Sequence, residues 1–367
     1  MTKNSTRLAG DRAAISGAVR LVALVFVLAL ALALATVGTG AAAAESRRDS
    51  TSLGESPPGQ VLVVDANLLE AFSREDVADP IDMENFVRRL LSQVPYAPDA
   101  LLLQEVVGPS AENVARIMTA ATGFTYVVAA GPGESHVVVP ATATTPEIRR
   151  ETAILLNVDT MRLEDSGGYV ENAYARADHR SGTWMTKQEP YLMAKELRGG
   201  LSTSLLSLHY VPNSRFTSAD VGFRYKAEWS GQIAQLLDDA YPSPSRRQVE
   251  VIGGDFNNRP CVEVDVAASD PGCTPMPFWQ VLTGDHGYIS ARDSGIDYIF
   301  ARGEILDSGF DAERKAAVGS NAEFAACKDL FTQGRGDDAT GTCATEFYAD
   351  HSFLWALVGM AKGPGRG

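Results

Sequence analysis

Acidic, amide and histidine residues stand at the ends of several apolar segments of this 367-residue sequence. Each of them closes an apolar run or directly precedes one: Asn67, Gln104, Glu105, His209, Asp255, Asn257, Asp350 and His351. Because polar groups at the ends of buried strands can converge at one rim of a sheet, we expect these side chains to lie together. Carboxylate and amide oxygens suit Mg²⁺ or Ca²⁺. Two well-separated histidines with carboxylates nearby suit a general acid and a general base.

Each signal taken alone also has an ordinary structural explanation. Gln104 and Glu105 could be a solvated strand end, and His209 could be a structural hydrogen-bonding residue. Residues 254–257, Gly-Asp-Phe-Asn, could form a simple turn, since Gly and Asn tolerate positive φ. The functional interpretation therefore depends on the ordered set rather than on any one member.

The elements that must position these residues follow from hydrophobic periodicity. Strands are expected at 61–65, 100–104, 124–129, 136–139, 152–158, 203–209, 249–253, 296–301 and 353–358. Helices are expected at 82–91, 111–121 and 218–240. Strands that are continuously apolar are buried on both faces, so we expect two sheets packed face to face with helices outside.

The first 44 residues differ from the rest of the chain. A basic head precedes an uncharged segment, 21–44, which ends in the small residues Ala42-Ala43-Ala44. This layout is typical of a secretory signal peptide, and the alternative is an uncleaved membrane anchor. We expect a signal peptide over 1–44, a Ser-, Gly- and Pro-rich linker over 45–59 and one folded domain over 60–360.

The formal net charge is −14, and it would be near −17 without segment 1–44, which holds four basic residues and one acidic residue. An acidic surface argues weakly against broad nucleic-acid affinity, which draws on Lys and Arg. It leaves open a site at which a few basic side chains serve one phosphate.

The four cysteines are Cys261, Cys273, Cys327 and Cys343. In an exported protein an even number favours disulfides, and four cysteines allow three pairings. We favour Cys261–Cys273 and Cys327–Cys343, because each pair closes a short loop rich in Gly, Asp or Pro. Zinc is disfavoured, since the sequence has no CxxC pair. Residues 303–348 are expected to be a surface insertion held by the second disulfide.

Six segments, in this order, resemble the successive motifs of the endonuclease/exonuclease/phosphatase superfamily. They are Val-Asp-Ala-Asn at 64–67, Leu-Gln-Glu at 103–105, Ser-Leu-His at 207–209, Gly-Asp-Phe-Asn at 254–257, Ile-Asp-Tyr-Ile at 296–299 and Ala-Asp-His at 349–351. The match runs from about residue 61 to residue 358. The resemblance implies an α/β fold of four layers, with two packed, mostly antiparallel sheets flanked by helices. It also implies metal-dependent phosphodiester hydrolysis.

Within the superfamily, the sequence most resembles deoxyribonuclease I and its relatives. Residues 150–155 are similar to their strand bearing a glutamate that holds the first catalytic histidine, which implies Glu151 as that residue. Residues 188–191 resemble an Arg-Glu-Pro-aromatic segment, but Gln188 replaces the arginine and leaves Lys187 as a substitute phosphate contact. Residues 209–213 add the Tyr-Val-Pro-Asn of abasic-site repair nucleases, which implies Tyr210 and Asn213 as further phosphate contacts.

The resemblance also implies a metal site. Glu105, with Asn67 nearby, would hold a divalent metal, which we expect to be Mg²⁺ with Mn²⁺ or Ca²⁺ as alternatives. Asp255, Asn257 and Asp350 would complete the phosphate and metal site.

Proton transfer is assigned to two histidine–carboxylate pairs. By the resemblance, His351, oriented by Asp297, would take a proton from the attacking water. His209, oriented by Glu151, would protonate the leaving oxygen. The two assignments could be exchanged.

Three readings of the substrate and activity remain open. A nucleic acid is favoured, on the resemblance to deoxyribonuclease I. A secreted sphingomyelinase or phospholipase C would use the same residues on a phospholipid head group, and would need exposed aromatics such as Phe278 and Trp279. A binding module that had lost catalysis should lack part of the set, and nothing in the set is missing. We expect an exported monomer without a stable protein partner.

Overall fold

The computed structural model describes residues 53–69, 81–133, 137–140, 142, 146–182, 185–241, 248–258, 277–292, 295–333 and 335–360. All of them belong to one of the chain's two units, Leu53–Gly367. The predicted signal peptide and the predicted Cys261–Cys273 disulfide lie outside the described residues.

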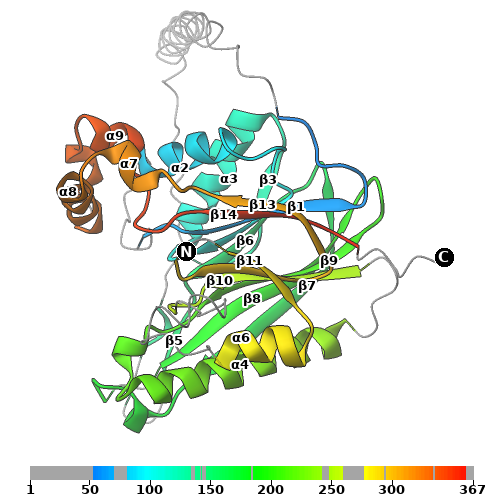
Figure 1. The fold of residues 1–367 in the computed structure, drawn as a ribbon, viewed down its shortest axis with the longest axis vertical. Helices are drawn as coiled ribbons and strands as arrows, with labels where there is room; N and C mark the ends of the chain where they lie inside the picture. Colours follow the sequence, from blue (N-terminus) through cyan, green and yellow to red (C-terminus); the bar gives the residue numbers. More distant parts are fainter. Residues whose placement is uncertain are drawn as a thin grey trace, which may run out of the picture. The chain divides into compact units, whose positions relative to one another are not determined.

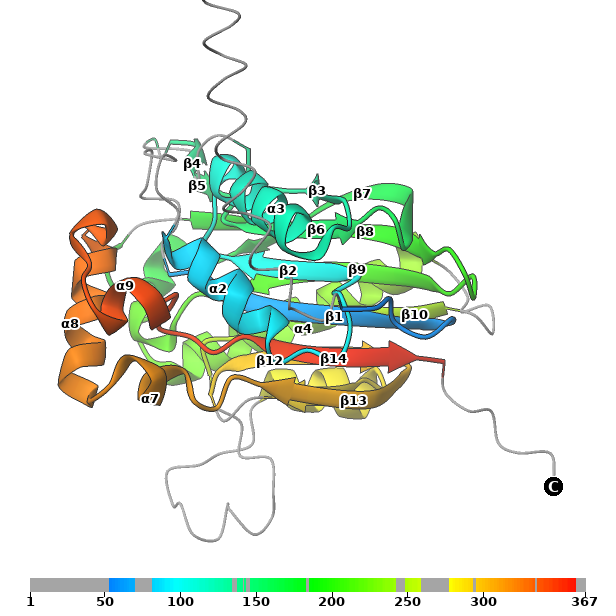
Figure 2. The same ribbon diagram turned by 90° about the horizontal axis from the view of Figure 1, so that it is seen from above.

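Two mixed sheets pack face to face (Figures 1 and 2). The first has the order β13-β14-β1-β2-β6-β3. Its strands are β1 (Gln60–Asn67), β2 (Ala100–Gln104), β3 (Tyr126–Ala130), β6 (Thr152–Asn157), β13 (Glu304–Phe310) and β14 (Leu354–Gly359).

The second sheet has the order β11-β12-β10-β9-β8-β5-β4, and β7 pairs with β8. Its strands are β4 (Val137–Val139), β5 (Glu147–Arg149), β7 (Met161–Ala173), β8 (Met185–Glu196), β9 (Ser202–His209), β10 (Gln248–Asp255), β11 (Ile289–Arg292) and β12 (Asp297–Arg302). Among the described strands, β1/β2, β9/β10 and β5/β8 pair in parallel and the other pairs are antiparallel.

Helices cover the outer face of each sheet (Figure 1). The first sheet carries α2 (Ile81–Leu91) and α3 (Gly108–Thr122), and the second carries α4 (Ala219–Ala240) and α6 (Pro277–Gln280). Short helical turns lie at Arg176–Asp178, Asn213–Arg215, Val281–Asp285 and Gly336–Asp338. The predicted four-layer α/β sandwich is therefore confirmed.

Three apolar clusters fill the interfaces between these layers, around Phe86, Leu102 and Phe256. Strand β2 shows why a central strand reads as one apolar run. Leu101 and Leu103 face the helices, whereas Leu102 faces the other sheet, because successive side chains point to opposite faces. The strands and helices expected from periodicity are all present, with ends shifted by a few residues.

The expectation for residues 303–348 was wrong in its first part. Residues 304–310 are β13, the edge strand beside β14, and not part of a surface insertion. The edge strand was missed because polar residues, Asp307 and Ser308, interrupt its exposed middle, so it lacks a continuous apolar run. Strand β7 was missed because most of it is exposed, and its partner β8 was missed because charged and polar residues interrupt its apolar ones.

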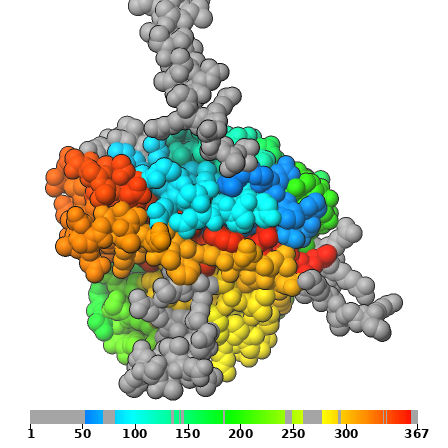
Figure 3. Space-filling model, turned by 45° about the horizontal axis from the view of Figure 1, so that its top comes forward, coloured from blue at the N-terminus to red at the C-terminus, as the bar shows by residue number. Residues whose placement is uncertain are grey.

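The remainder of this segment folds into three helices, α7 (Arg314–Val318), α8 (Asn321–Thr332) and α9 (Thr342–Glu346). We call α7, α8 and α9 the helical unit. It has its own apolar cluster of Val318, Phe324, Cys327, Phe331 and Phe347. The predicted Cys327–Cys343 disulfide is present within it. In the space-filling view this orange-to-red unit lies beside the cyan surface of α2 (Figure 3).

The segment before β1 is fastened to the domain. Ser56 is fully buried, and its hydroxyl donates to Asp99 at 2.5 Å. The Gly59 N–H donates to the Glu196 carboxylate at 3.2 Å. Residues 53–59 of the expected linker thus pack against the body. Within the described part of the chain, no helix combines the length and apolar character needed to cross a membrane.

Gly254→Ala should destabilise the fold strongly. A Cβ at Gly254 would lie 1.9 Å from the Leu208 carbonyl oxygen, so the paired backbones of β9 and β10 would have to separate. We expect the free energy of unfolding in urea to fall by about 1–3 kcal/mol or more. Gly54→Ala is the matched control, because nothing lies within 4 Å of its added Cβ. Equal stability of the two variants would contradict this strand register.

Candidate functional site

Strand register brings the predicted residues to one rim of the sandwich. In the parallel pair β9/β10, His209 lies opposite Asp255, and in the antiparallel pair β10/β12, Asp255 lies opposite Asp297. In the first sheet, Asn67 at the end of β1 lies opposite Gln104 at the end of β2. The sequence predicted that the strand ends converge, and the strand pairing places these residues in adjacent positions.

A buried polar layer joins the two sheets beneath this rim. Gln104 Nε2 donates to Asp65 Oδ1 at 2.9 Å and to Ser207 Oγ at 3.2 Å. Ser207 Oγ in turn donates to the Leu103 carbonyl at 3.0 Å. These groups are fully buried, so their hydrogen bonds tie the sheets together in one arrangement.

The Asp255 carboxylate lies at the centre of the cluster. Its Oδ2 lies 3.2 Å from Asn67 Nδ2, 3.7 Å from His209 Nε2 and 3.9 Å from His351 Nε2. Its Oδ1 accepts the Asn257 backbone N–H at 2.6 Å. Two histidines far apart in the sequence therefore face the same carboxylate oxygen.

The first histidine is paired with Glu151, as predicted by the resemblance. His209 Nδ1 lies 2.8 Å from Glu151 Oε1, although the ring N–H is not aligned on that oxygen. Burial alone would raise the pKa of Glu151, but the charges of Lys187 and His209 hold it well below its usual range. Burial and Lys187 lower the pKa of His209, while Glu151 and Asp255 outweigh them, so it is raised.

The second histidine is paired with Asp297. His351 Nδ1 lies 3.0 and 3.1 Å from the two Asp297 oxygens. Burial lowers the pKa of His351, but the charges of Asp297 and Asp255 outweigh it and raise the pKa well above its usual value. Each imidazole is thus oriented through Nδ1 and directs Nε2 towards Asp255.

Asp350 lies next to this pair but makes a contact that the sequence did not predict. Its Oδ2 accepts from Lys328 Nζ at 2.5 Å, and its Oδ1 lies 3.7 Å from His351 Nε2. Burial would raise the pKa of Asp350, but His351 and Lys328 lower it. Lys328 comes from the helical unit, which has no motif, so no sequence signal marks it.

The residues at this rim fit a divalent cation. Asn67 Nδ2 donates to Glu105 Oε1 at 3.0 Å and to Asp255 Oδ2 at 3.2 Å, so one amide faces two carboxylates. Two sets of potential ligand atoms each lie within 4.8 Å of one another, namely Glu105, His209 and Asp255, and Asp255, Asp297 and His351. The donor atoms are hard oxygens and imidazole nitrogens with an excess of negative charge, which suits Mg²⁺ or Mn²⁺.

The predicted phosphate contacts are placed differently. Lys187 is buried in an ion pair with Glu151. The Tyr210 hydroxyl is buried against Ser230 of α4 at 2.8 Å, and Asn213 Nδ2 donates to Asn258 at 2.7 Å. The structure therefore brings Lys187 to the cluster but turns the side chains of Tyr210 and Asn213 away from it.

A pocket of about 390 Å³ opens beside His209. Its lining is Glu105, Arg149, Glu151, His179, Ser181, Met185, Lys187, His209, Val211, Pro212 and Arg215. Sequence reasoning missed Arg149 and Arg215. Both arginines lie two residues from a motif residue, Glu151 or Asn213, in an acidic chain. That position in the sequence could have indicated a basic group at the site.

Lys226 was also missed. It is fully buried on α4, and its Nζ donates to the carbonyls of Phe256 at 2.9 Å and Asn257 at 3.2 Å. Burial lowers its pKa to about 7, although Asp255 opposes the shift. The ammonium thus holds the turn in which Asn257 adopts φ +50°. A lysine on the apolar face of a helix, seven residues before Ile233, was the signal in the sequence.

Asp297→Asn should remove most of the function of His351 while leaving the fold intact. The change removes the charge that orients the imidazole but keeps the shape of the side chain. We expect turnover to fall by ~10²–10⁴-fold, measured per folded molecule with folding checked by circular dichroism. Asp307→Asn on exposed β13 is the matched control. Near-normal turnover for Asp297→Asn would remove this pair from the chemistry.

No protein-family model matches this chain, and no curated protein matches its sequence. Solved structures do match, in 172 chains. An endonuclease/exonuclease/phosphatase from Bacteroides vulgatus is 11% identical, with 82% of this chain and 99% of that chain covered and a TM-score of 0.47. One from Beutenbergia cavernae is 15% identical, with coverages of 83% and 73% and a TM-score of 0.46.

The human Nocturnin catalytic domain with bound sulfate is 12% identical, with coverages of 82% and 94% and a TM-score of 0.45. These values describe a distant likeness. The solved structures to which this chain is similar include members of the endonuclease/exonuclease/phosphatase superfamily. This is the superfamily that the six ordered motifs resemble.

Proposed function

We propose that this protein is a divalent-metal-dependent phosphodiesterase whose preferred substrate is a nucleic acid. The observation that carries the proposal is the convergence of two histidine–carboxylate pairs on Asp255. His209 is held by Glu151 and His351 by Asp297, and both Nε2 atoms lie within 3.9 Å of Asp255 Oδ2. One displacement at phosphorus needs one base and one acid, and this arrangement supplies both.

His351 takes a proton from the attacking water, and His209 gives one to the leaving oxygen. In each pair the carboxylate fixes the orientation of the ring and stabilises the imidazolium, as orienting acids do in other acid–base pairs. The assignments can be exchanged without changing which residues are required. Asn257 supports the centre by donating to Asp255 Oδ2 at 3.1 Å.

Glu105 and Asp255 would hold the metal, with Asn67 bracing both carboxylates. A divalent cation there would polarise the phosphate oxygens and offset the negative charge that develops on them. Lys187 acts indirectly, because its ion pair keeps Glu151 ionised beside His209.

Two features support a nucleic acid ahead of a lipid. The pocket beside His209 is lined by Arg149 and Arg215, and basic side chains serve a polyanionic backbone. The aromatic pair that a lipid-directed enzyme would expose is packed against the apolar cluster around Phe256, with Trp279 partly buried. Phe278 is fully buried, and the Trp279 ring packs against Tyr298 and Phe300.

Export and a monomeric state belong to the same proposal. The Cys327–Cys343 disulfide supports export, because structural disulfides persist in oxidising compartments.

Glu105→Gln should abolish most of the activity, because it removes a charge from the metal site. We expect a loss of roughly 10²-fold or more in turnover, together with weaker Mn²⁺ binding by calorimetry. Glu112→Gln on the exposed face of α3 is the matched control. Full activity of the unmodified protein in excess EDTA would defeat the proposal.

A substrate panel should rank nucleic acid first. The panel comprises plasmid DNA, RNA, sphingomyelin, phosphoinositides and a bis-aryl phosphate, each with and without EDTA. We expect plasmid or RNA to be cleaved fastest, and only without EDTA. Much faster cleavage of sphingomyelin than of plasmid would reverse the order.

A further inference from the structure

We propose that Lys328 is a positioning residue for Asp350, and that the Cys327–Cys343 disulfide fixes Lys328 in that role. The inference rests on the proposed function, because Asp350 matters through its neighbour His351. It adds to the site a residue that comes from neither sheet.

The two oxygens of Asp350 have different surroundings. Oδ2 accepts from Lys328 Nζ at 2.5 Å. Oδ1 is buried without a hydrogen bond to any described residue and lies 3.7 Å from His351 Nε2. The lysine therefore decides which oxygen faces the imidazole and keeps the carboxylate from rotating. No other described group makes a hydrogen bond to Asp350 that could do so.

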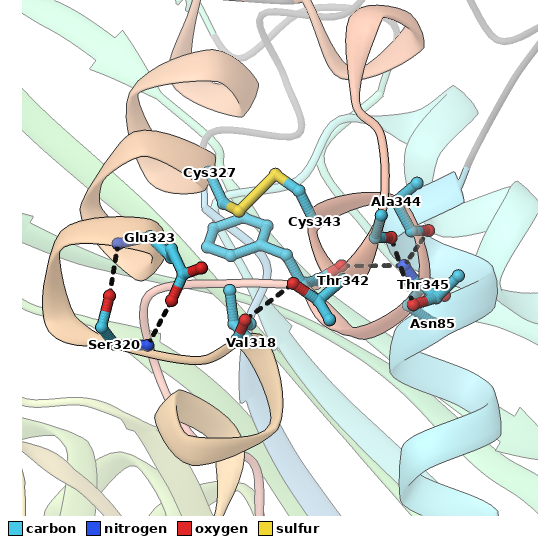
Figure 4. The surroundings of a disulfide bond; sticks show 11 residues. Asn85, Val318, Ser320, Glu323, Cys327, Thr342, Cys343, Ala344 and Thr345 are labelled. Carbon is cyan, nitrogen blue, oxygen red and sulfur yellow. Dashed lines mark hydrogen bonds between the residues drawn. A yellow bond between two sulfur atoms is a disulfide. The ribbon is translucent and has the colours of Figure 1, made fainter.

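The ion pair between Lys328 and Asp350 is too exposed to fix the position of the lysine by itself. The Lys328 side chain is 43% exposed, and a half-exposed pair contributes little stability by itself. The position of the lysine thus depends on the rigidity of α8. That helix begins with a reciprocal capping box between Ser320 and Glu323 (Figure 4). Its Phe331 ring packs on Phe347 with centroids 4.9 Å apart.

The disulfide joins the two segments that must meet. Cys327 immediately precedes Lys328, and Cys343 lies on α9, the helix that leads to Asp350. Helix α9 is itself fastened to the first sheet's helical layer, because Asn85 Nδ2 of α2 donates to the Ala344 carbonyl at 2.9 Å (Figure 4). The covalent bond therefore transmits the position of α9 to the turn of α8 that carries the lysine.

A double-mutant cycle tests this coupling. Lys328→Met should lower turnover by ~10- to ~100-fold, the cost of a misplaced group near the reacting atoms, while Lys328→Arg retains more activity. Combined with Asp350→Asn, the lysine change should have no further effect, because its target is already lost. Lys315→Met, an exposed lysine of the same helical unit, is the matched control and should resemble the wild type. Equal losses from Lys328→Met with and without Asp350→Asn would overturn the proposal.

Reduction of the disulfide gives the second arm. In the wild type, a phosphine reductant or Cys343→Ser should lower turnover, and the same treatment should have little effect on Lys328→Met. An equal effect of reduction on both proteins would overturn the role of the disulfide.

Crystal structures of the wild type and Lys328→Met give a readout that needs no activity. The Asp350 carboxylate should turn away from His351 in the variant, and an unchanged carboxylate would overturn the proposal. If the wild type cleaves no phosphodiester, the proposed function fails, whereas this comparison still decides what Lys328 does.

Discussion

The hydrogen bond from Gln104 to Ser207 joins the two sheets directly beneath the site, and the site depends on that union. Each histidine–carboxylate pair takes one member from each sheet. His209 ends β9 of the second sheet, whereas Glu151 precedes β6 of the first. Likewise Asp297 begins β12 of the second sheet, and His351 lies just before β14 of the first. A sheet shifted by one residue would separate both pairs at once, so the two histidine–carboxylate pairs exist only when the sheets are packed in this register.

The residues of the central strands could be predicted because burial on both faces leaves an unmistakable apolar run, and the polar residue ending that run must lie at the rim. Side-chain direction was harder to predict. Tyr210 follows His209 and points to the opposite side, towards Ser230, as successive residues of extended chain do. That alternation was available from the sequence and would have excluded the Tyr210 hydroxyl. Lys328 was not predictable, because its contact with Asp350 arises from helix packing with no periodic signature.

Two of the protein's lysine side chains are buried close to the cluster, although its net charge is strongly negative. Lys187 neutralises Glu151, and Lys226 donates to the carbonyls of Phe256 and Asn257. Buried ammonium groups are costly unless they are paired or hydrogen-bonded, and here both conditions are met by groups that carry the candidate chemistry. These two cations thus act on the protein's own backbone and carboxylates.

The direction of β1 determines where the two ends of the domain lie. Gln60 pairs with Gly359, so the first residue of β1 lies beside the last residue of β14. Both lie at the end of the strands opposite to Asn67. Hydrogen bonds hold residues 53–59 at that same end of the sheets. A fusion partner joined at either end of the domain would therefore lie away from the candidate site and leave it open to solvent. The adjacent ends also make the domain suited to circular permutation, with a short peptide bridging them and new ends opened in an exposed turn.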